Sequence, residues 1–323
     1  MANKSKLLAG AVGADGEERR ALARSLETLG IEPGDIRLFS GKAAGTEIDL
    51  ESDEAQVLLP LERGLVSDLD ALFLFRCDAE CSASLRGWAK KGNFWLFDLS
   101  ETGGTKEVDP EQSAEELVKS GPVLGVPEAS AYWCAKLLDG LSGFKPLTAT
   151  CHLLLPASKR GEAGVRELFE QSARAMNFQM KRGENLAFSV SPEPQNKESL
   201  LAFDRTMKAM APRNLPEVSR VVLNVPVFHM SAISLVVHLS SPAKARKAAE
   251  AALKMAGFTV VKGSKWPVEG ASMAESRPLA KVEAQEESLF IWLVYDNARD
   301  GKVALATSAL AKLSWAGRQE LSS

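Results

Sequence analysis

The alternation of strand-like and helix-like segments in the first hundred residues most constrains the fold of this 323-residue chain. Residues 6–9 form a short apolar run that ends at Gly10, and residues 17–29 carry apolar side chains at helical spacing before Gly30. Further strands are expected at residues 36–39, 69–75 and 94–97, and a further helix at residues 82–91. Strands separated by helices imply right-handed crossover connections, so we predict a parallel sheet.

The pattern changes after Pro127. Long β-rich runs predict strands at residues 147–155 and 288–295 and an extended strand pair or a bent strand at residues 218–239. Helical spacing is found at residues 164–176, 243–255 and 301–318. Long strands with fewer helices are typical of an α+β domain with a mainly antiparallel or mixed sheet.

The composition is that of a soluble globular chain. With 45% hydrophobic and 25% charged residues, the chain can bury a large core over more than one domain. The net charge of −3, with acids and bases interleaved, does not fit a nucleic-acid partner. The first residues do not form a signal peptide and no apolar run approaches about eighteen residues, so we expect no membrane span and a cytoplasmic location.

The cysteines are too few and too scattered for a disulfide framework; they are Cys77, Cys81, Cys134 and Cys151. Cys77 and Cys81 lack a second pair at the spacing of a zinc site. We interpret all four as reduced thiols, and Cys134 and Cys151 as core residues.

Three glycines, Gly10, Gly13 and Gly16, lie between the first strand and the first helix. In such a turn the backbone amides at the helix N-terminus can hold a pyrophosphate. The alternative is that the glycines only let the strand and the helix pack closely. Asp15 argues against a bound anion, because its carboxylate would repel phosphate.

Five short segments match the motifs of one known family. Residues 127–131 read P-E-A-S-A where the family has P-N-C-S-T, and residues 224–231 read N-V-P-V-F-H-M-S where it has R-V-P-V-F-x-G-H-S. Residues 161–168, 186–192 and 296–301 match G-K-x-G-V-x-E-L, I-A-F-N-V-I-P and D-N-L-R-K-G. The chain therefore resembles the aspartate-semialdehyde dehydrogenase family over nearly its whole length.

The resemblance implies an α/β fold of two domains. Residues 1–128 and 297–323 would form a Rossmann-type NAD(P)-binding domain, and residues 129–296 an α+β semialdehyde dehydrogenase dimerisation domain. A homodimer through the second domain is implied, and the long apolar strands favour it because one sheet face cannot bury all their side chains.

NADP is the cofactor that the resemblance implies. Its matching positions are Gly10, Gly13, Gly16, Ser40 and Lys42, with Lys42 on the family's Arg for the 2′-phosphate. A solvated turn is the other interpretation of Lys42. Bulky and charged residues at 75–80 replace the small-residue loop that lies against the cofactor, and this disfavours the usual nucleotide position.

The reacting residues of the family are missing. Its nucleophilic Cys falls on Ala129 and its acid/base His on Ser231. A methyl group cannot attack a carbonyl, and a serine cannot move protons near neutral pH. His229 is a weak candidate base, because it would share a strand face with Ser231; a structural histidine is the alternative.

Residues that bind the substrate in the family are replaced as well. Its two anion-binding arginines fall on Asn224 and Gly104, its Gln on Leu155, and its Asn near Leu305. The favoured hypothesis is a catalytically inactive aspartate-semialdehyde dehydrogenase-like protein that keeps the dimeric scaffold for a binding, regulatory or assembly role. The alternative is an active NAD(P)-dependent oxidoreductase that acts on an aldehyde or acyl phosphate with altered catalytic residues.

Overall fold

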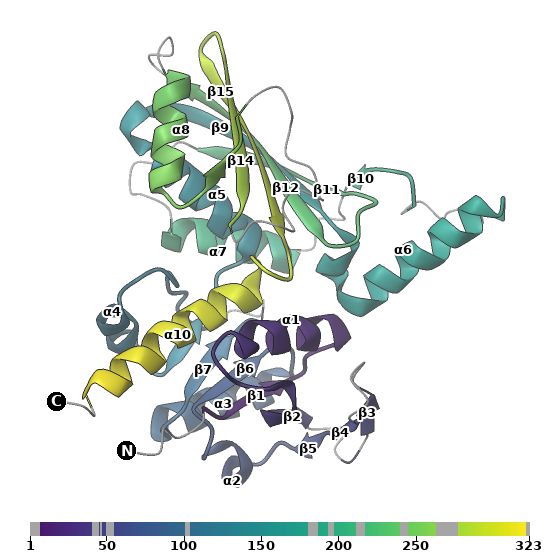
Figure 1. The fold of residues 1–323 in the computed structure, drawn as a ribbon, viewed down its shortest axis with the longest axis vertical. Coiled ribbons are helices and arrows are strands. Elements are labelled where there is room, and N and C mark those ends of the chain that lie inside the picture. Colours follow the sequence, from purple (N-terminus) through teal and green to yellow (C-terminus); the bar gives the residue numbers. More distant parts are fainter. Residues whose placement is uncertain are drawn as a thin grey trace. The chain divides into compact units, whose positions relative to one another are not determined.

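The computed structural model describes residues 7–40, 45, 47–49, 55–100, 104–179, 187–192, 197–210, 217–239, 245–262 and 277–320. The chain divides into two compact units (Figure 1). Unit 1 comprises Met1–Pro127 and Lys302–Ser323, and unit 2 comprises Glu128–Gly301.

Unit 1 contains a six-stranded sheet in the order β5-β2-β1-β6-β7-β8. Its strands are β1 (Ala9–Val12), β2 (Ile36–Ser40), β5 (Leu59–Pro60), β6 (Ala71–Leu74), β7 (Trp95–Asp98) and β8 (Val123–Gly125). Every neighbouring pair in this sheet is parallel. The predicted parallel sheet is confirmed. Two short strands, β3 (Glu47–Asp49) and β4 (Ala55–Val57), pair antiparallel outside it.

The helices of unit 1 are α1 (Gly16–Glu27), α2 (Arg63–Val66), α3 (Ala79–Lys91), α4 (Ala114–Lys119) and α10 (Lys302–Glu320). Helix α10 packs against α1 and α4. Lys302 Nζ donates to the Leu99 carbonyl at 3.2 Å, and Lys312 Nζ donates to the Gln112 carbonyl at 3.0 Å. These bonds attach the end of the chain to the parallel-sheet unit.

Strand β1 lies three residues later than the sequence predicts, at Ala9–Val12. Gly10 is therefore a strand residue and does not belong to the turn. A side chain there would approach the side chains of Leu69 and Phe39 to 2.8 Å and the Arg37 carbonyl to 3.2 Å. The missing side chain lets β1 continue through Gly10 between tightly packed neighbours.

Unit 2 contains a seven-stranded sheet in the order β10-β11-β9-β12-β15-β14-β13. Its strands are β9 (Pro146–Leu155), β10 (Ser191–Pro192), β11 (Val218–Asn224), β12 (Met230–Leu239), β13 (Thr259–Val260), β14 (Leu279–Gln285) and β15 (Ser288–Asp296). The β9/β11 and β13/β14 pairs are parallel and the others antiparallel, which confirms the mixed sheet. Strands β11 and β12 do not pair with each other, because β9 lies between them.

Helices α5 (Ala129–Gly140), α7 (Lys197–Met210) and α8 (Ala245–Met255) lie on one side of this sheet (Figure 1). The core forms between them and the inward residues of β9, β12 and β15, among them Cys151, Leu235 and Ile291. Helix α6 (Gly161–Met176) extends away from the sheet and packs on the short 3₁₀ turn η3 (Ala157–Arg160). Helix α7 was not predicted.

The four cysteines are free thiols. Cys134 and Cys151 are buried, with their sulfur atoms 3.8 Å apart, so they are core residues as predicted. None of the helices in the described residues is long and apolar enough to cross a membrane.

Candidate functional site

The glycine turn of unit 1 joins β1 to α1. Gly13 has a φ of +69°, and Gly16 is the first residue of α1. A side chain on Gly13 would lie 1.8 Å from the carbonyl oxygen of Arg76, which follows β6. Gly13 is thus required by two constraints, its left-handed backbone and the close approach of another loop.

The N-terminus of α1 carries a capping box. Asp15 is the N-cap and accepts a hydrogen bond from the Glu18 N–H at 2.9 Å, while Glu18 Oε2 accepts from the Asp15 N–H at 2.9 Å. Arg76 Nη2 pairs with Asp15 Oδ2 at 3.1 Å and also with Glu18. Burial raises the pKa of Glu18, against the opposing effects of the Asp15 N–H and Arg76.

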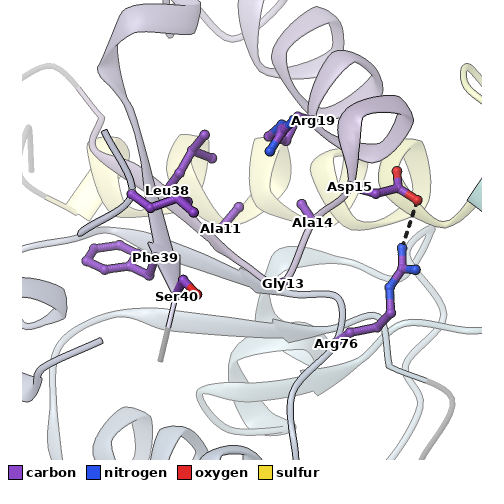
Figure 2. Close-up of a pocket in the computed structure, with 10 residues that line it drawn as sticks. Ala11, Gly13, Ala14, Asp15, Arg19, Leu38, Phe39, Ser40 and Arg76 are labelled. Carbon is purple, nitrogen blue, oxygen red and sulfur yellow. Dashed lines mark hydrogen bonds and ion pairs between the residues drawn. The ribbon is translucent and has the colours of Figure 1, made fainter. Parts of the chain in front are cut away.

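A pocket of about 250 Å³ opens beside this capping box (Figure 2). Its lining includes Ala14, Asp15, Arg19, Leu38, Ser40 and Arg76. The Nε of Arg19 is buried and has no hydrogen-bond partner among the described residues. Ser40, one of the predicted cofactor contacts, lines this pocket, whereas Lys42 falls outside the described residues.

The residues around the glycine turn do not fit the diphosphate of NADP. Two carboxylates, Asp15 and Glu18, already accept two of the N–H groups at the start of α1, those of Glu18 and Asp15. The pocket is also smaller than the roughly 300–1,000 Å³ typical of ligand sites.

In unit 2 the structure brings Ala129 and Ser231 to one cluster of hydroxyl groups. Ser231 on β12 pairs with Tyr295 on β15, and the Tyr295 hydroxyl hydrogen-bonds the side chains of Ser231 and Ser130. The distance from Ser130 Oγ to the Tyr295 hydroxyl is 2.9 Å. All four residues are buried. Burial, and next the charge of Glu128, raise the pKa of Tyr295 to about 12, so its hydroxyl stays neutral.

Glu128, next to this cluster, belongs to a partly buried ion pair. Its Oε2 accepts from the Ala131 N–H at 2.8 Å and caps α5, and its Oε1 pairs with Lys159 Nζ at 2.8 Å. The Glu128 N–H donates to Thr206 Oγ1 at 2.9 Å. Each carboxylate oxygen of Glu128 thus has a partner, and the residue lies next to Ala129 in the chain.

The segment before β12 is attached to η3. The Val227 and Phe228 carbonyls accept from the Ala157 and Ser158 N–H groups at 2.8 and 2.9 Å. His229 lies in a bend outside β12, so the alternation of an extended strand does not put it on the face of Ser231.

The positions matched to substrate-binding residues lie in both units. Asn224 and Leu155 are register partners on β11 and β9. Gly104 has a φ of +88°, and a side chain there would lie 2.7 Å from Arg86 Nη1. Leu305 is buried on α10.

Sequence reasoning missed Glu128, Lys159 and Tyr295. The capping box was readable, because an Asp followed three residues later by Glu before a helical pattern is its signature. Tyr295 and Lys159 had no local signal, since each meets its partner only through the fold. Within the described ranges, no group of three or more His, Cys, Asp or Glu side chains could hold a metal ion.

Asp300, just before α10, has its pKa raised to about 6, first by burial and also by the charge of Asp296. The folded state therefore binds this proton more tightly than the unfolded state. Ionisation of Asp300 lowers stability as the pH rises from about 4 to 6, and the cost is absent below that window. We expect Asp300→Asn to raise the unfolding free energy by about 1–3 kcal/mol at pH 7.5 and by little at pH 4.

The Asn side chain can still accept the Asp296 N–H, which now donates to Asp300 Oδ2 at 3.0 Å. Denaturant unfolding at the two pH values measures the difference. The protein must be freshly purified, because the Asn-Gly pair that the substitution creates deamidates on storage. An equal gain at both pH values would contradict the ionisation argument.

The two units define a class of protein: a parallel α/β sheet of the nucleotide-binding type, joined in one chain to an α+β unit with a mixed sheet. Solved structures of similar fold are aspartate-semialdehyde dehydrogenases. The probable enzyme from Pseudomonas aeruginosa has 19% identity and a TM-score of 0.79, covering 96% of this chain and 98% of that chain. Aspartate semialdehyde dehydrogenase II from Vibrio cholerae has 16% identity and a TM-score of 0.77, at the same coverage of 96% and 98%.

A third structure, the Candida albicans enzyme with NADP, has 13% identity and a TM-score of 0.66, covering 95% of this chain and 99% of that chain. The chain therefore has the aspartate-semialdehyde dehydrogenase fold, and the low identity fits a divergent relative. No protein-family model matches the sequence. No curated protein matches it either.

Proposed function

We propose that this chain is a catalytically inactive aspartate-semialdehyde dehydrogenase-like protein that keeps the scaffold for a binding, regulatory or assembly role. The observation that carries the proposal is the hydroxyl cluster of unit 2. The Tyr295 hydroxyl hydrogen-bonds both Ser130 and Ser231. Ala129, next to Ser130, and Ser231 are the two positions matched to the thiol and the imidazole of the resembled family.

The cluster lacks the groups that acyl transfer to phosphate requires. The reaction needs a nucleophile that is deprotonated, or that a neighbouring base can deprotonate, near neutral pH. Tyr295 has a pKa of about 12, and the nearby Lys159 ammonium is paired with Glu128. Neither group can accept a proton from Ser130 at neutral pH.

A homodimer through unit 2 is part of the proposal. The outward residues of its central strands include the half-buried Leu154, Val236, Phe290 and Trp292, and Val221 is 43% exposed. Phe169 and Met176 on α6 are 65% and 70% exposed. An apolar sheet face and an extended helix with exposed apolar side chains support a second copy as the cover, through a two-fold interface of about 2,000 Å² or more.

The test is an assay for phosphate-dependent reduction of NADP with aspartate semialdehyde, together with light scattering on the same sample. We expect no turnover and a mass of two 34.8 kDa chains. Turnover above about one per minute, far below the common enzyme range of about 1–1,000 per second, would support the alternative of an active oxidoreductase. A single-chain mass at micromolar concentration would exclude the dimer.

A further inference from the structure

Two N–H groups at the start of α1 donate to carboxylates of the protein itself. In turns of this type, the free N–H groups of the first helical turn point at the ligand's phosphate. Here the Asp15 and Glu18 N–H groups each donate at 2.9 Å to a carboxylate, one from Glu18 and one from Asp15. The turn therefore has an internal anion in place of an external one.

Arg76 completes this internal site. Its guanidinium bridges the Asp15 and Glu18 carboxylates, as Figure 2 shows for Asp15. Asp15, Glu18 and Arg76 together carry a formal charge of −1, and Arg19, which also lines the pocket, carries the opposite charge. A diphosphate at the Asp15 and Glu18 N–H groups would meet the two carboxylates in a partly buried setting, where solvent screens them less than at an open surface.

The backbone at Gly13 provides an independent observation. A glycine in a nucleotide-binding turn leaves room for the pyrophosphate to approach the main chain. In this protein the Arg76 carbonyl occupies the place of a Gly13 side chain, since it lies 1.8 Å from where that Cβ would be. The loop after β6 therefore packs on the turn, and the remaining open space beside it is the pocket of about 250 Å³.

We propose that the Asp15–Glu18 capping box and Arg76 exclude dinucleotides and other diphosphate ligands from the glycine turn, and that Glu18 determines this exclusion. Glu18 accepts the Asp15 N–H and also pairs with Arg76, so its removal frees the Asp15 N–H and leaves Arg76 with one carboxylate, that of Asp15, in place of two. The inference rests on the proposed function, because it assigns the unit 1 site a specificity different from that of the resembled enzymes.

The experiment measures binding of inorganic pyrophosphate and NADPH by calorimetry to the full chain and to variants, without any aldehyde. We expect Glu18→Ala to bind pyrophosphate at least about 30-fold more tightly than the unchanged protein, which corresponds to about 2 kcal/mol. The gain should shrink with added salt, since it is electrostatic.

Glu17→Ala is the matched control. It removes one carboxylate from the same helical turn, but Glu17 pairs with Arg20 and not with Arg76. Its affinity for pyrophosphate should stay within about threefold of the unchanged protein, because its charge lies outside the Arg76 cluster. Glu18→Gln keeps the shape of the cap and removes the charge, so it serves if Glu18→Ala does not fold; it should give a smaller gain in the same direction.

Equal pyrophosphate affinity of folded Glu18→Ala and the unchanged protein would overturn the inference. So would saturable NADPH binding by the unchanged protein at about 10 μM or tighter. Either result leaves the proposed function standing if the assay shows no turnover, and turnover would contradict the proposed function whatever the binding data show.

Discussion

Replacement of Gly13 by alanine is expected to lower the unfolding free energy by about 3–5 kcal/mol. The new Cβ would lie 1.8 Å from the Arg76 carbonyl oxygen and 2.9 Å from its nitrogen. These are backbone atoms, so no side-chain rotation can relieve the overlap, and the turn or the loop after β6 must move. The φ of +69° adds the cost of a left-handed conformation for a residue with a side chain.

Gly30→Ala is the matched control. Gly30 also has a positive φ, of +79°, but nothing lies within 4 Å of an added side chain. Its expected loss is therefore only the backbone cost, about 1–2 kcal/mol. Denaturant unfolding of both variants measures the difference. Similar losses for the two would show that the Arg76 loop does not press on Gly13.

Removal of the Lys159 ammonium is expected to lower the unfolding free energy by about 3 kcal/mol. Lys159→Met keeps most of the aliphatic chain but leaves the Glu128 carboxylate, which is 6% exposed, without its cation. A buried carboxylate without its partner is costly, although the remaining Ala131 N–H still donates to it at 2.8 Å. The Lys159 side chain is 23% exposed, so solvent reduces the loss below the upper values known for fully buried pairs.

Two further variants test this explanation. Lys119→Met breaks the exposed pair with Glu115, whose side chains are 77% and 86% exposed, and should change stability by less than about 0.5 kcal/mol. Glu128→Gln combined with Lys159→Met removes both charges and should recover part of the loss. If the double variant is less stable than Lys159→Met alone, the loss does not come from an uncompensated carboxylate.

Both predicted losses concern places where the resembled enzymes bind or react with ligands. Functional sites in proteins often carry strain or unpaired groups at a cost in stability. In this chain the corresponding groups are paired internally, Glu18 with Arg76 and Glu128 with Lys159. This internal pairing agrees with the proposed inactive scaffold.

Local pattern in the sequence determined the elements of the fold. The side-chain pattern of a strand or a helix repeats every few residues, so it is visible without knowledge of distant neighbours. The parallel sheet of unit 1, the mixed sheet of unit 2 and the helix at residues 164–176 were predicted in this way. The motif matches added the family fold, because their order along the chain survives even where the reacting residues are replaced.

Only the tertiary structure decided which residues of these elements contact one another. Ser130 meets Tyr295 across 165 residues, and Arg76 meets Asp15 across 61, because neighbouring strands in the sheets bring distant segments together. The sequence also predicts Gly10 and Gly13 as part of a ligand-binding turn. In the structure Leu69 packs closely on Gly10 and Arg76 on Gly13, which the sequence does not indicate. Sequence spacing carries no record of such long-range contacts, since they depend on strand order and register, which form only when the whole sheet assembles.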